Sequence, residues 1–480
     1  MSDEPRNAPT DADIMVTLAR EDAEMFRSKT RTYATLATNA GRRTLPVRGQ
    51  AFASWLRLKF LDAQGRSAPA AAVKAAITTL EDLASLEPEK PVYLRTALHE
   101  GKVYLDLADG SGGAIEISAE GWRVEPFPGV RFIQSDLTMA LPRPSREGSL
   151  DSLKPILNLA DDADFQLAMT WCVAALMPSG PYPLATVGGE QGAGKTFFCR
   201  ALHDLVDPSA LPLRALPRNE RELFIACQNT HTLAFDNISA IGDWLSDSLC
   251  KIATGGGMSL RKLYTDDGET YFEATKPVIL NGIDDVVKRP DLADRAVIFT
   301  LPAIPEEEKV DPEILQARFE ACRPAVFGAL LDLMALALAR LPTLETTRLP
   351  RMAGFARLGI AIEEAFGPAG CFMEAYDANR ADASTSLAES DTLVAAVRKL
   401  VVAQPVWQGS ATDLARALEP RLVPPKRLEP ASLGGRLRRI APVLRANGVA
   451  IEFSRERKNR DRVIVVSAIS PAPPPSAPSA

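Results

Sequence analysis

GEQGAGKT, at residues 189–196, is a complete match to the pattern G-x-x-x-x-G-K-[ST] of a phosphate-binding loop. In such a loop, glycines let backbone N–H groups curl around phosphates, the lysine reaches the terminal phosphates, and the Thr or Ser hydroxyl contributes to a Mg²⁺ site. The sequence therefore predicts a nucleotide site with ATP and Mg²⁺ as cofactors. We expect its binding residues to be Gly189, Glu190, Gln191, Gly192, Ala193, Gly194, Lys195 and Thr196.

The residues around this segment predict a strand, a loop and a helix in that order. A short apolar run at 184–187 precedes the loop, and a helical stretch at 197–206 follows it and stops before Asp207 and Pro208. The motif requires this order, because the amino terminus of the helix adds its partial positive charge to the phosphate site. The fold class expected for this part of the chain is α/β.

A second nucleotide motif, TLAFDN at residues 232–237, is an apolar strand that ends in an acid. Asp236 is expected to hold Mg²⁺ together with Thr196. The next residue is Asn237, where many ATPases have a glutamate that polarises the attacking water; an amide orients water but does not accept its proton. The sequence thus predicts nucleotide binding more firmly than hydrolysis. Glu190 is either a displaced base or a solvent-exposed loop acid.

Polar residues also mark the two strands that follow. Two half-strands at 259–264 and 269–275 flank a turn at 265–268 that ends in Asp-Gly, which predicts a hairpin. The next strand, at 277–280, ends at Asn281, which places an amide where open α/β sheets bind ligands. Arg295 directly precedes another apolar strand. An arginine there is usually a surface ion-pair partner; the alternative is an arginine finger that reaches the γ-phosphate of a neighbouring subunit.

The succession GEQGAGKT, LAFDN, the hairpin from TGGG to RKLY, KPVILNG and ADRAVIF resembles the AAA+ ATPases of phages and integrated mobile elements. These are related to superfamily 3 helicases and to the helicase part of phage primase-helicases. The resemblance covers residues 150–305 and, more weakly, the helical segment that starts at Arg351. It implies a hexameric ring, with Asn281 as sensor 1 and Arg295 as the finger.

The same resemblance implies that the hairpin contacts DNA in a central channel through Arg261 and Lys262, with Lys276 as a further candidate. The hairpin tip departs from the family pattern because it is acidic, with Asp266, Asp267 and Glu269. Asn237 is a second departure, and it puts robust unwinding in doubt.

The chain divides further outside the ATPase core at 150–305. Residues 1–15 and 471–480 have the composition of disordered tails. Residues 16–149 are expected to form an α+β accessory domain, and 306–390 a helical lid or linker. Asp106 and Asp109 are the nearest approach to a second catalytic carboxylate pair, but no third acid accompanies them, so a scaffolding or substrate-guiding role is favoured.

Residues 391–470 carry 15 Lys/Arg against 7 Asp/Glu, a net charge of +8 in a chain whose net charge is −6. Three helices followed by a basic hairpin predict a winged-helix DNA-binding domain, with residues 432–447 as the recognition helix. Its DNA contacts are expected at Arg436, Arg439, Arg455, Arg457, Lys458 and Arg460. If four to six phosphates are neutralised, log K falls with log[salt] at a slope of roughly −4 to −5. The alternative is a solvated, charged face on a protein-interaction domain.

Composition excludes several other classes of protein. Six cysteines far apart in sequence and only three histidines suggest neither a disulfide framework nor a zinc site. The amino terminus has no signal-like apolar segment, and no apolar span of membrane length is evident. We therefore expect a cytoplasmic protein with no membrane partner.

Two hypotheses follow from these patterns. The first is an ATP-dependent DNA helicase or translocase of a phage or mobile element, acting in DNA replication as an oligomeric ring, with DNA, further copies of itself and a separate primase or initiator as partners. The alternative is an ATP-switched DNA-binding or replication-initiation assembly protein with little hydrolysis, which Asn237 favours. A small-molecule kinase is disfavoured, because the hairpin, Arg295 and the basic module would lack a purpose.

Overall fold

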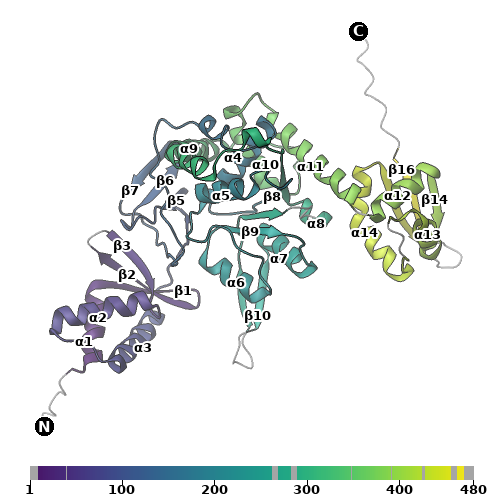
Figure 1. The fold of residues 1–480 in the computed structure, drawn as a ribbon. Helices are drawn as coiled ribbons and strands as arrows, with labels where there is room; N and C mark the ends of the chain where they lie inside the picture. Colours follow the sequence, from purple (N-terminus) through teal and green to yellow (C-terminus); the bar gives the residue numbers. More distant parts are fainter. Residues whose placement is uncertain are drawn as a thin grey trace.

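The computed structural model describes residues 9–469 except 39–40, 262–268, 283–288, 348, 391, 424–426 and 456–461 (Figure 1). For residues 257–261 and 269–273, and for a few residues near the carboxyl end, only the backbone is described. All six cysteines are free thiols.

The amino-terminal part has a hydrophobic core of its own. A three-stranded antiparallel sheet packs against three helices, and the core contains Met15, Phe52, Phe60 and Leu80. In chain order the elements are α1 (Asp11–Asp22), β1 (Ala23–Ser28), β2 (Arg31–Thr38), β3 (Gly41–Pro46), α2 (Gln50–Gln64) and α3 (Ala70–Leu86).

Helix α1 corrects the predicted extent of the disordered amino-terminal tail. The helix begins at Asp11, so the prediction is wrong for residues 11–15. A capping box stabilises this start: the Thr10 hydroxyl accepts the Asp13 N–H, and the Asp13 carboxylate accepts the Thr10 N–H. This stretch has the polar composition of a disordered tail, but Thr10 and Asp13 within it form a helix-start signal.

A second antiparallel sheet shares its core with the central part of the chain. Its strands are β4 (Thr96–His99), β5 (Lys102–Asp106), β6 (Ala114–Ser118) and β7 (Gly121–Glu125). Buried residues of this sheet, such as Leu105 and Ile117, belong to the same hydrophobic cluster as helix α9 (Pro312–Arg340) (Figure 1). The range 16–149, predicted as one accessory domain, therefore contributes to two separate cores.

The central sheet is four-stranded and parallel, with the order β13-β8-β12-β9. It is surrounded by helices, including the almost fully buried α4. The edge strand β13 is covered by α11, because the Asn379 side chain exchanges two hydrogen bonds with the backbone of Ile298. The elements are α4 (Asp162–Leu176), β8 (Leu184–Gly189), α5 (Lys195–Val206), α6 (Glu220–Asn229), β9 (Leu233–Ile238), α7 (Asp243–Thr254), β12 (Val278–Gly282), α8 (Pro290–Ala293), β13 (Ala296–Leu301), α10 (Ala353–Ile362) and α11 (Cys371–Ser390).

The predicted hairpin before β12 is present as two paired strands. β10 (Gly257–Arg261) and β11 (Glu269–Glu273) are antiparallel, with Gly257 opposite Glu273 and Arg261 opposite Glu269. Of the predicted acidic tip, Asp266 and Asp267 lie outside the described residues, and Glu269 is the first residue of β11.

Helix α9 is long and apolar enough to cross a membrane by length and composition alone. The expectation that the chain has no apolar span of membrane length is wrong for this helix. In the structure the helix belongs to the interior, because Phe327, Leu330 and Met334 are fully buried and the helix packs against β6, β7 and α4. A core helix covered on several sides has the same all-round hydrophobicity as a membrane span.

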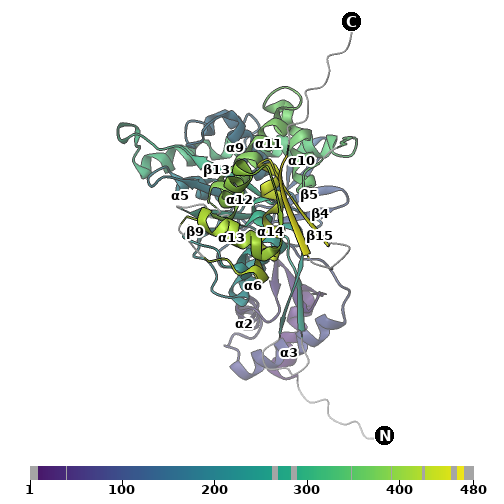
Figure 2. The same cartoon turned by 90° about the vertical axis from the view of Figure 1, so that its right-hand side faces the viewer.

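The carboxyl-terminal part combines three helices with a three-stranded antiparallel sheet of order β14-β16-β15. Leu433, Leu437, Ile440 and Leu444, which recur at i, i+4, i+7 and i+11, are buried on one face of α14. Figure 2 shows the three helices beside β15, and α14 packs against this strand. The elements are α12 (Thr392–Ala403), β14 (Val406–Gly409), α13 (Ala411–Leu418), α14 (Pro430–Ala446), β15 (Val449–Arg455) and β16 (Arg462–Ala468).

Candidate nucleotide-binding site

The predicted phosphate-binding loop connects the central strand β8 to the amino terminus of α5. Its glycines Gly189, Gly192 and Gly194 have φ angles of 129°, 86° and 83°, a region that side chains with a Cβ rarely adopt. A Cβ on Gly189 would lie 2.6 Å from the Leu301 carbonyl oxygen. A Cβ on Gly192 or Gly194 would meet only side-chain atoms of Lys309 and Ile304, at 3.9 and 3.8 Å, apart from neighbours in the chain. The backbone is thus shaped as a cradle with open space beside it.

Lys195 is folded back onto this loop. Its Nζ donates hydrogen bonds to the carbonyl oxygens of Gly189, at 2.6 Å, and Glu190, at 2.7 Å. A cation held only by neutral carbonyl groups gains when phosphate oxygens replace them, since charge-assisted hydrogen bonds are about twice as strong as neutral ones. Glu190 and Gln191 are exposed on the outer side of the loop, whereas Ala193 is buried.

The structure brings Thr196, Asp236 and Asn281 together. Strand β12 lies between β8 and β9, so the residue at its carboxyl end, Asn281, lies between the two predicted nucleotide motifs. The Asn281 amide donates to the Thr196 hydroxyl at 3.3 Å and to the Asp236 carboxylate. Its side-chain oxygen is buried and has no hydrogen-bond partner among the described residues. A buried acceptor without a partner is costly unless a ligand or water supplies the hydrogen bond.

Asn237 adopts a backbone conformation that the sequence did not reveal. Its φ of 57° lies in the left-handed region, which Asn tolerates better than most residues. The pairing of β9 with β12 shifts register here: Leu280 faces Phe235 and Gly282 faces Ile238, so β9 has one residue more than β12. Such a bulge redirects side chains. The Asn237 N–H donates to the Asp236 carboxylate at 2.8 Å, and the Asn237 side chain is exposed.

These oxygen donors fit a magnesium ion. The Thr196 hydroxyl and the Asp236 carboxylate both contact the same Asn281 amide, and Mg²⁺ prefers one or two such protein ligands plus phosphate and water oxygens. Among the described residues there is no group of three or more His, Cys, Asp and Glu side chains that would hold a metal alone. The arrangement therefore suits a cation that arrives with a phosphate ligand.

Arg295 lies at the other end of the sheet. In the parallel pairing of β13 with β8, Ala296 is opposite Leu184 and Leu301 is opposite Gly189. At about 3.3 Å per residue, Arg295 is roughly 17 Å or more from the phosphate loop of its own chain. One Arg295 Nη donates to the Asp291 carbonyl, while its buried Nε has no partner among the described residues. Arg351 is at the same end, 3.7 Å from Asp294.

The segment that follows β13 lies beside the phosphate-binding loop, a contact that the sequence did not predict. The Asn158 amide donates to the carbonyl oxygens of Ala193, at 3.1 Å, and Pro302, at 2.7 Å, and so ties the loop to this segment. Lys309 lies beside Gly192, with its ammonium group paired to Glu306. Both contacts join residues far apart in sequence, so no local sequence pattern predicts them.

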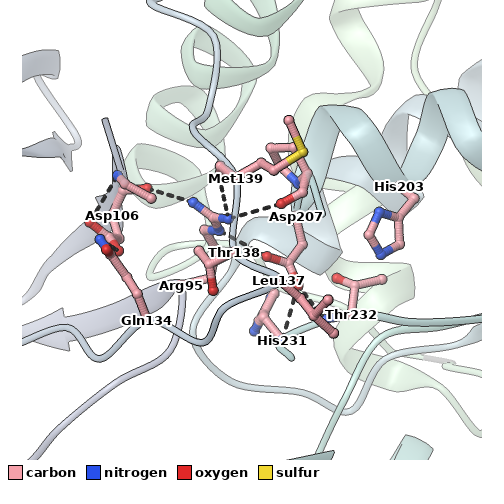
Figure 3. Close-up of polar contacts among 12 residues, drawn as sticks. Arg95, Asp106, Gln134, Leu137, Thr138, Met139, His203, Asp207, His231 and Thr232 are labelled. Carbon is pink, nitrogen blue, oxygen red and sulfur yellow. Dashed lines mark hydrogen bonds and ion pairs between the residues drawn. The ribbon is translucent and has the colours of Figure 1, made fainter. Parts of the chain in front are cut away.

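A buried cation connects the nucleotide motifs to the second sheet (Figure 3). Arg95 is 1 % exposed, and its Nε donates to the Asp207 carboxylate at 2.9 Å. Its other nitrogens donate to the carbonyl oxygens of Asp106 and Met139. The second Asp207 oxygen accepts the backbone N–H groups of His231 and Thr232, directly before β9. This network, the Arg95–Asp207 network, thus joins β5, the carboxyl end of α5 and the start of β9.

Two buried histidines beside Asp207 predict a pH dependence of stability. Burial lowers the pKa of His203 and of His231 to about 4 in the folded protein, against about 6.5 in an unfolded chain. Between these values the unfolded chain binds more protons, so the free energy of unfolding decreases as the pH falls from about 6.5 toward 4. Each histidine contributes up to about 1.4 kcal/mol per pH unit in that window.

Melting temperatures measured from pH 7.5 to 5 check this. His203→Leu should make the loss of stability on acidification shallower than in the wild type, because one of the two groups is gone. Asp164, whose pKa burial raises to about 6, acts in the opposite direction in both proteins and cancels in the comparison. Replacing His99, the exposed third histidine, by Gln is the control. Identical pH profiles for His203→Leu and wild type would contradict the assignment.

The predicted DNA contacts are only partly within the described structure. Arg261 ends β10 and Arg455 ends β15, with only their backbones described, and of Arg439 only its place in α14 is known. Lys262, Arg457, Lys458 and Arg460 lie outside the described residues. Arg436 is half-buried on α14, and the neighbouring Arg438 lies over the Phe453 ring, 4.4 Å from its centre.

A parallel sheet with helices, a phosphate-binding loop after its central strand and polar residues at the carboxyl ends of the neighbouring strands define an α/β nucleoside-triphosphatase-like core. Residues 150–385 match the model of the actinomycete integrative conjugative element replication protein family, and residues 393–478 match that of the RepA C-terminal domain of the same elements. The two ranges cover about two thirds of the chain, and the chain belongs to this family. The resemblance to proteins of integrated mobile elements is therefore confirmed.

Solved structures with a similar arrangement include "SCCmec type IV Cch - active helicase", 12 % identical, with a TM-score of 0.49 over 93 % of each chain. The apo A form of the NrS-1 C-terminal region is also 12 % identical, with a TM-score of 0.42 over 97 % of this chain and 100 % of that one. No curated protein sequence matches the chain.

Proposed function

We propose that this protein is an ATP-dependent DNA helicase or translocase that serves the replication of a mobile element in the cytoplasm, as a hexameric ring with a core of the AAA+ type. The observation that carries the proposal is the convergence of the phosphate loop, Asp236 and Asn281 at one edge of the parallel sheet. The family match supports a role in replication.

In the proposed site, each residue has a role that follows from its position. The loop backbone from Gly189 to Gly194 and the Lys195 ammonium group bind the phosphates of ATP. Thr196 and Asp236 hold Mg²⁺, which neutralises charge on the phosphates when bound. Asn281, whose unpaired side-chain oxygen is buried beside them, accepts a hydrogen bond from the attacking water and orients it.

Of the groups that hydrolysis requires, the proton acceptor is the one that this site supplies least clearly. Asn237 is exposed next to Asp236 and orients water without accepting its proton. Glu190 is exposed on the loop and is the candidate base. Asn237 therefore favours the second candidate function, an ATP-switched DNA-binding or initiation assembly protein with little hydrolysis.

Arg295 is proposed to complete the ATP site of a neighbouring subunit. Its position at the far end of the sheet places it too far from the phosphate loop of its own chain to act in that ATP site. An arginine that reaches across an interface stabilises the charge of the transferred phosphoryl group. ATP then lies between subunits, and hydrolysis is coupled to movement of the hairpin β10–β11.

The carboxyl-terminal module is proposed to be a winged helix that binds duplex or forked DNA. Three helices and the sheet β14-β16-β15 supply the required parts, with α14 as recognition helix and the β15–β16 hairpin as wing. The excess of Lys and Arg in residues 391–470 favours phosphate contacts. A separate primase or initiator is the expected protein partner.

One experiment separates the two candidate functions. ATP turnover is measured alone, with single-stranded DNA and with forked DNA, and the molecular mass is measured in the same buffers. DNA-stimulated turnover by an oligomer that separates the strands supports the motor, whereas nucleotide-dependent assembly with negligible turnover supports the switch. Lys195→Ala should reduce turnover to background, and Lys251→Ala, an exposed lysine on α7, should leave it unchanged. Full turnover by Lys195→Ala would reject the ATP site itself.

A further inference from the structure

A polar cavity of about 510 Å³ lies in the amino-terminal part of the chain, away from the phosphate-binding loop. It is enclosed by the β2–β3 hairpin, the connection between β5 and β6, and residues 128–134. Its volume falls within the range of small-ligand pockets, about 300 to 1,000 Å³. The nucleotide site of the core does not account for it, because all its lining residues lie between Glu24 and Gln134.

The walls of this cavity are fixed against each other. A Cβ on Gly41, at the start of β3, would lie 1.7 Å from the Ser111 carbonyl oxygen. A Cβ on Gly112 would lie 2.3 Å from the Arg42 carbonyl oxygen. The hairpin and the β5–β6 connection therefore meet backbone to backbone, and glycine is required on both sides of the contact. The cavity is preformed, which lowers the ordering cost of binding a ligand.

Positive charge is available at the rim of the cavity. Arg42 and Arg43 are exposed, and in the part of the chain that the structure describes neither makes an ion pair or a side-chain hydrogen bond. Arg131 differs, because it is neutralised by Glu24 at 2.9 Å. Two guanidinium groups thus remain for an anionic ligand, and their planar geometry matches phosphate oxygens.

The wall of the cavity contains an aromatic ring, that of Phe132, and the polar side chain of Gln134. The Phe132 ring is half-buried in the wall, where it packs against Tyr93 with 6.3 Å between the ring centres. The part of an aromatic ring that stays accessible can stack on a base of any sequence. Gln134 is exposed, and its amide nitrogen donates a hydrogen bond to the buried Asp106 carboxyl at 2.9 Å (Figure 3). That bond fixes the amide plane and leaves its oxygen, which has no partner among the described residues, to accept from a base edge.

We propose that this cavity binds one nucleotide unit, with the base against Phe132, its edge at Gln134 and the phosphate at Arg42 and Arg43. The unit comes either from an unpaired position of a DNA strand or from a free nucleotide, and the chemistry of recognition is the same for both. This site is independent of the ATP site, so it stands or falls separately from the proposed motor.

The test uses the full chain carrying Lys195→Ala, so that the phosphate loop does not contribute. A 2′-deoxynucleoside monophosphate is titrated by calorimetry, and a short single-stranded oligodeoxynucleotide with a photoreactive base is crosslinked and mapped by mass spectrometry. Arg42→Gln with Arg43→Gln should weaken the affinity by about tenfold or more for the probe that binds. Arg20→Gln with Arg57→Gln makes the same charge change on exposed residues outside the cavity and should leave it within about twofold.

Each outcome has a stated meaning. Crosslinks within residues 128–134 without monophosphate binding identify a DNA strand as the source, and arginine-dependent monophosphate binding identifies a free nucleotide. Phe132→Leu keeps the charge and should still weaken binding, because the stacking face is lost. The proposal is overturned if the two arginine double variants behave alike and no crosslink maps to 128–134. It is also overturned if polyglutamate displaces either probe as well as unlabelled nucleotide does.

Discussion

Arg295→Ala is expected to reduce ATP turnover by about a thousandfold or more while nucleotide affinity changes little. An arginine finger contributes on the order of 10³- to 10⁵-fold to phosphoryl transfer, because it stabilises charge that develops only in the transition state. In the proposed site, ATP is bound by the loop of the same chain, at the opposite end of the sheet from Arg295. Steady-state turnover and titration with a fluorescent ATP analogue separate the two effects.

Mixing two inactive variants tests whether Arg295 acts across an interface. Lys195→Ala supplies an intact finger, and Arg295→Ala supplies an intact phosphate loop. In a mixed ring, some interfaces combine the two intact halves, so turnover should recover when the variants are co-assembled. Absence of recovery, or loss of ATP binding by Arg295→Ala, would show that the arginine is not a finger. Arg351→Ala is the matched control, since this arginine lies at the same end of the sheet and contacts Asp294.

The second large effect is expected on stability. Arg95→Met should destabilise the fold by about 3 to 5 kcal/mol, because it leaves the buried Asp207 carboxylate without its cation. Burial by itself raises the pKa of Asp207, but Arg95 and the Thr232 N–H hold the pKa below its ordinary value. The carboxylate would therefore remain charged and unpaired, or take up a proton and lose its partners. Thermal and urea unfolding measure the change.

A double-mutant cycle isolates the ion pair from the rest of the Arg95–Asp207 network. Asp207→Asn removes the charge but retains the side chain's shape and an acceptor. The double variant should be less destabilised than the sum of the two single variants, since neither charge is then left alone. Arg143→Met, which breaks an exposed ion pair with Asp109, should cost less than about 1 kcal/mol. Strict additivity of Arg95→Met and Asp207→Asn would mean that the two side chains do not stabilise each other.

Local sequence patterns were sufficient to predict several elements of the structure. The loop at 189–196, the strand before it, the helix after it and the apolar face of α14 all follow from glycine placement and hydrophobic periodicity. These signals depend on residues within one turn or one strand of each other, where backbone sterics and side-chain period dictate the result. The capping box at Thr10 was also local, yet its polar composition was mistaken for disorder.

The sequence by itself determined that a phosphate-binding loop exists and that an acid and an amide end two later strands. Only the tertiary structure decided that β12 lies between β8 and β9, which places Asn281 against both Thr196 and Asp236. It also decided the bulge at Asn237 and the burial of Arg95 between two sheets and a helix. Strand order and long-range ion pairs join residues separated by tens to more than a hundred positions, so they depend on how hydrophobic faces pack and not on any local propensity.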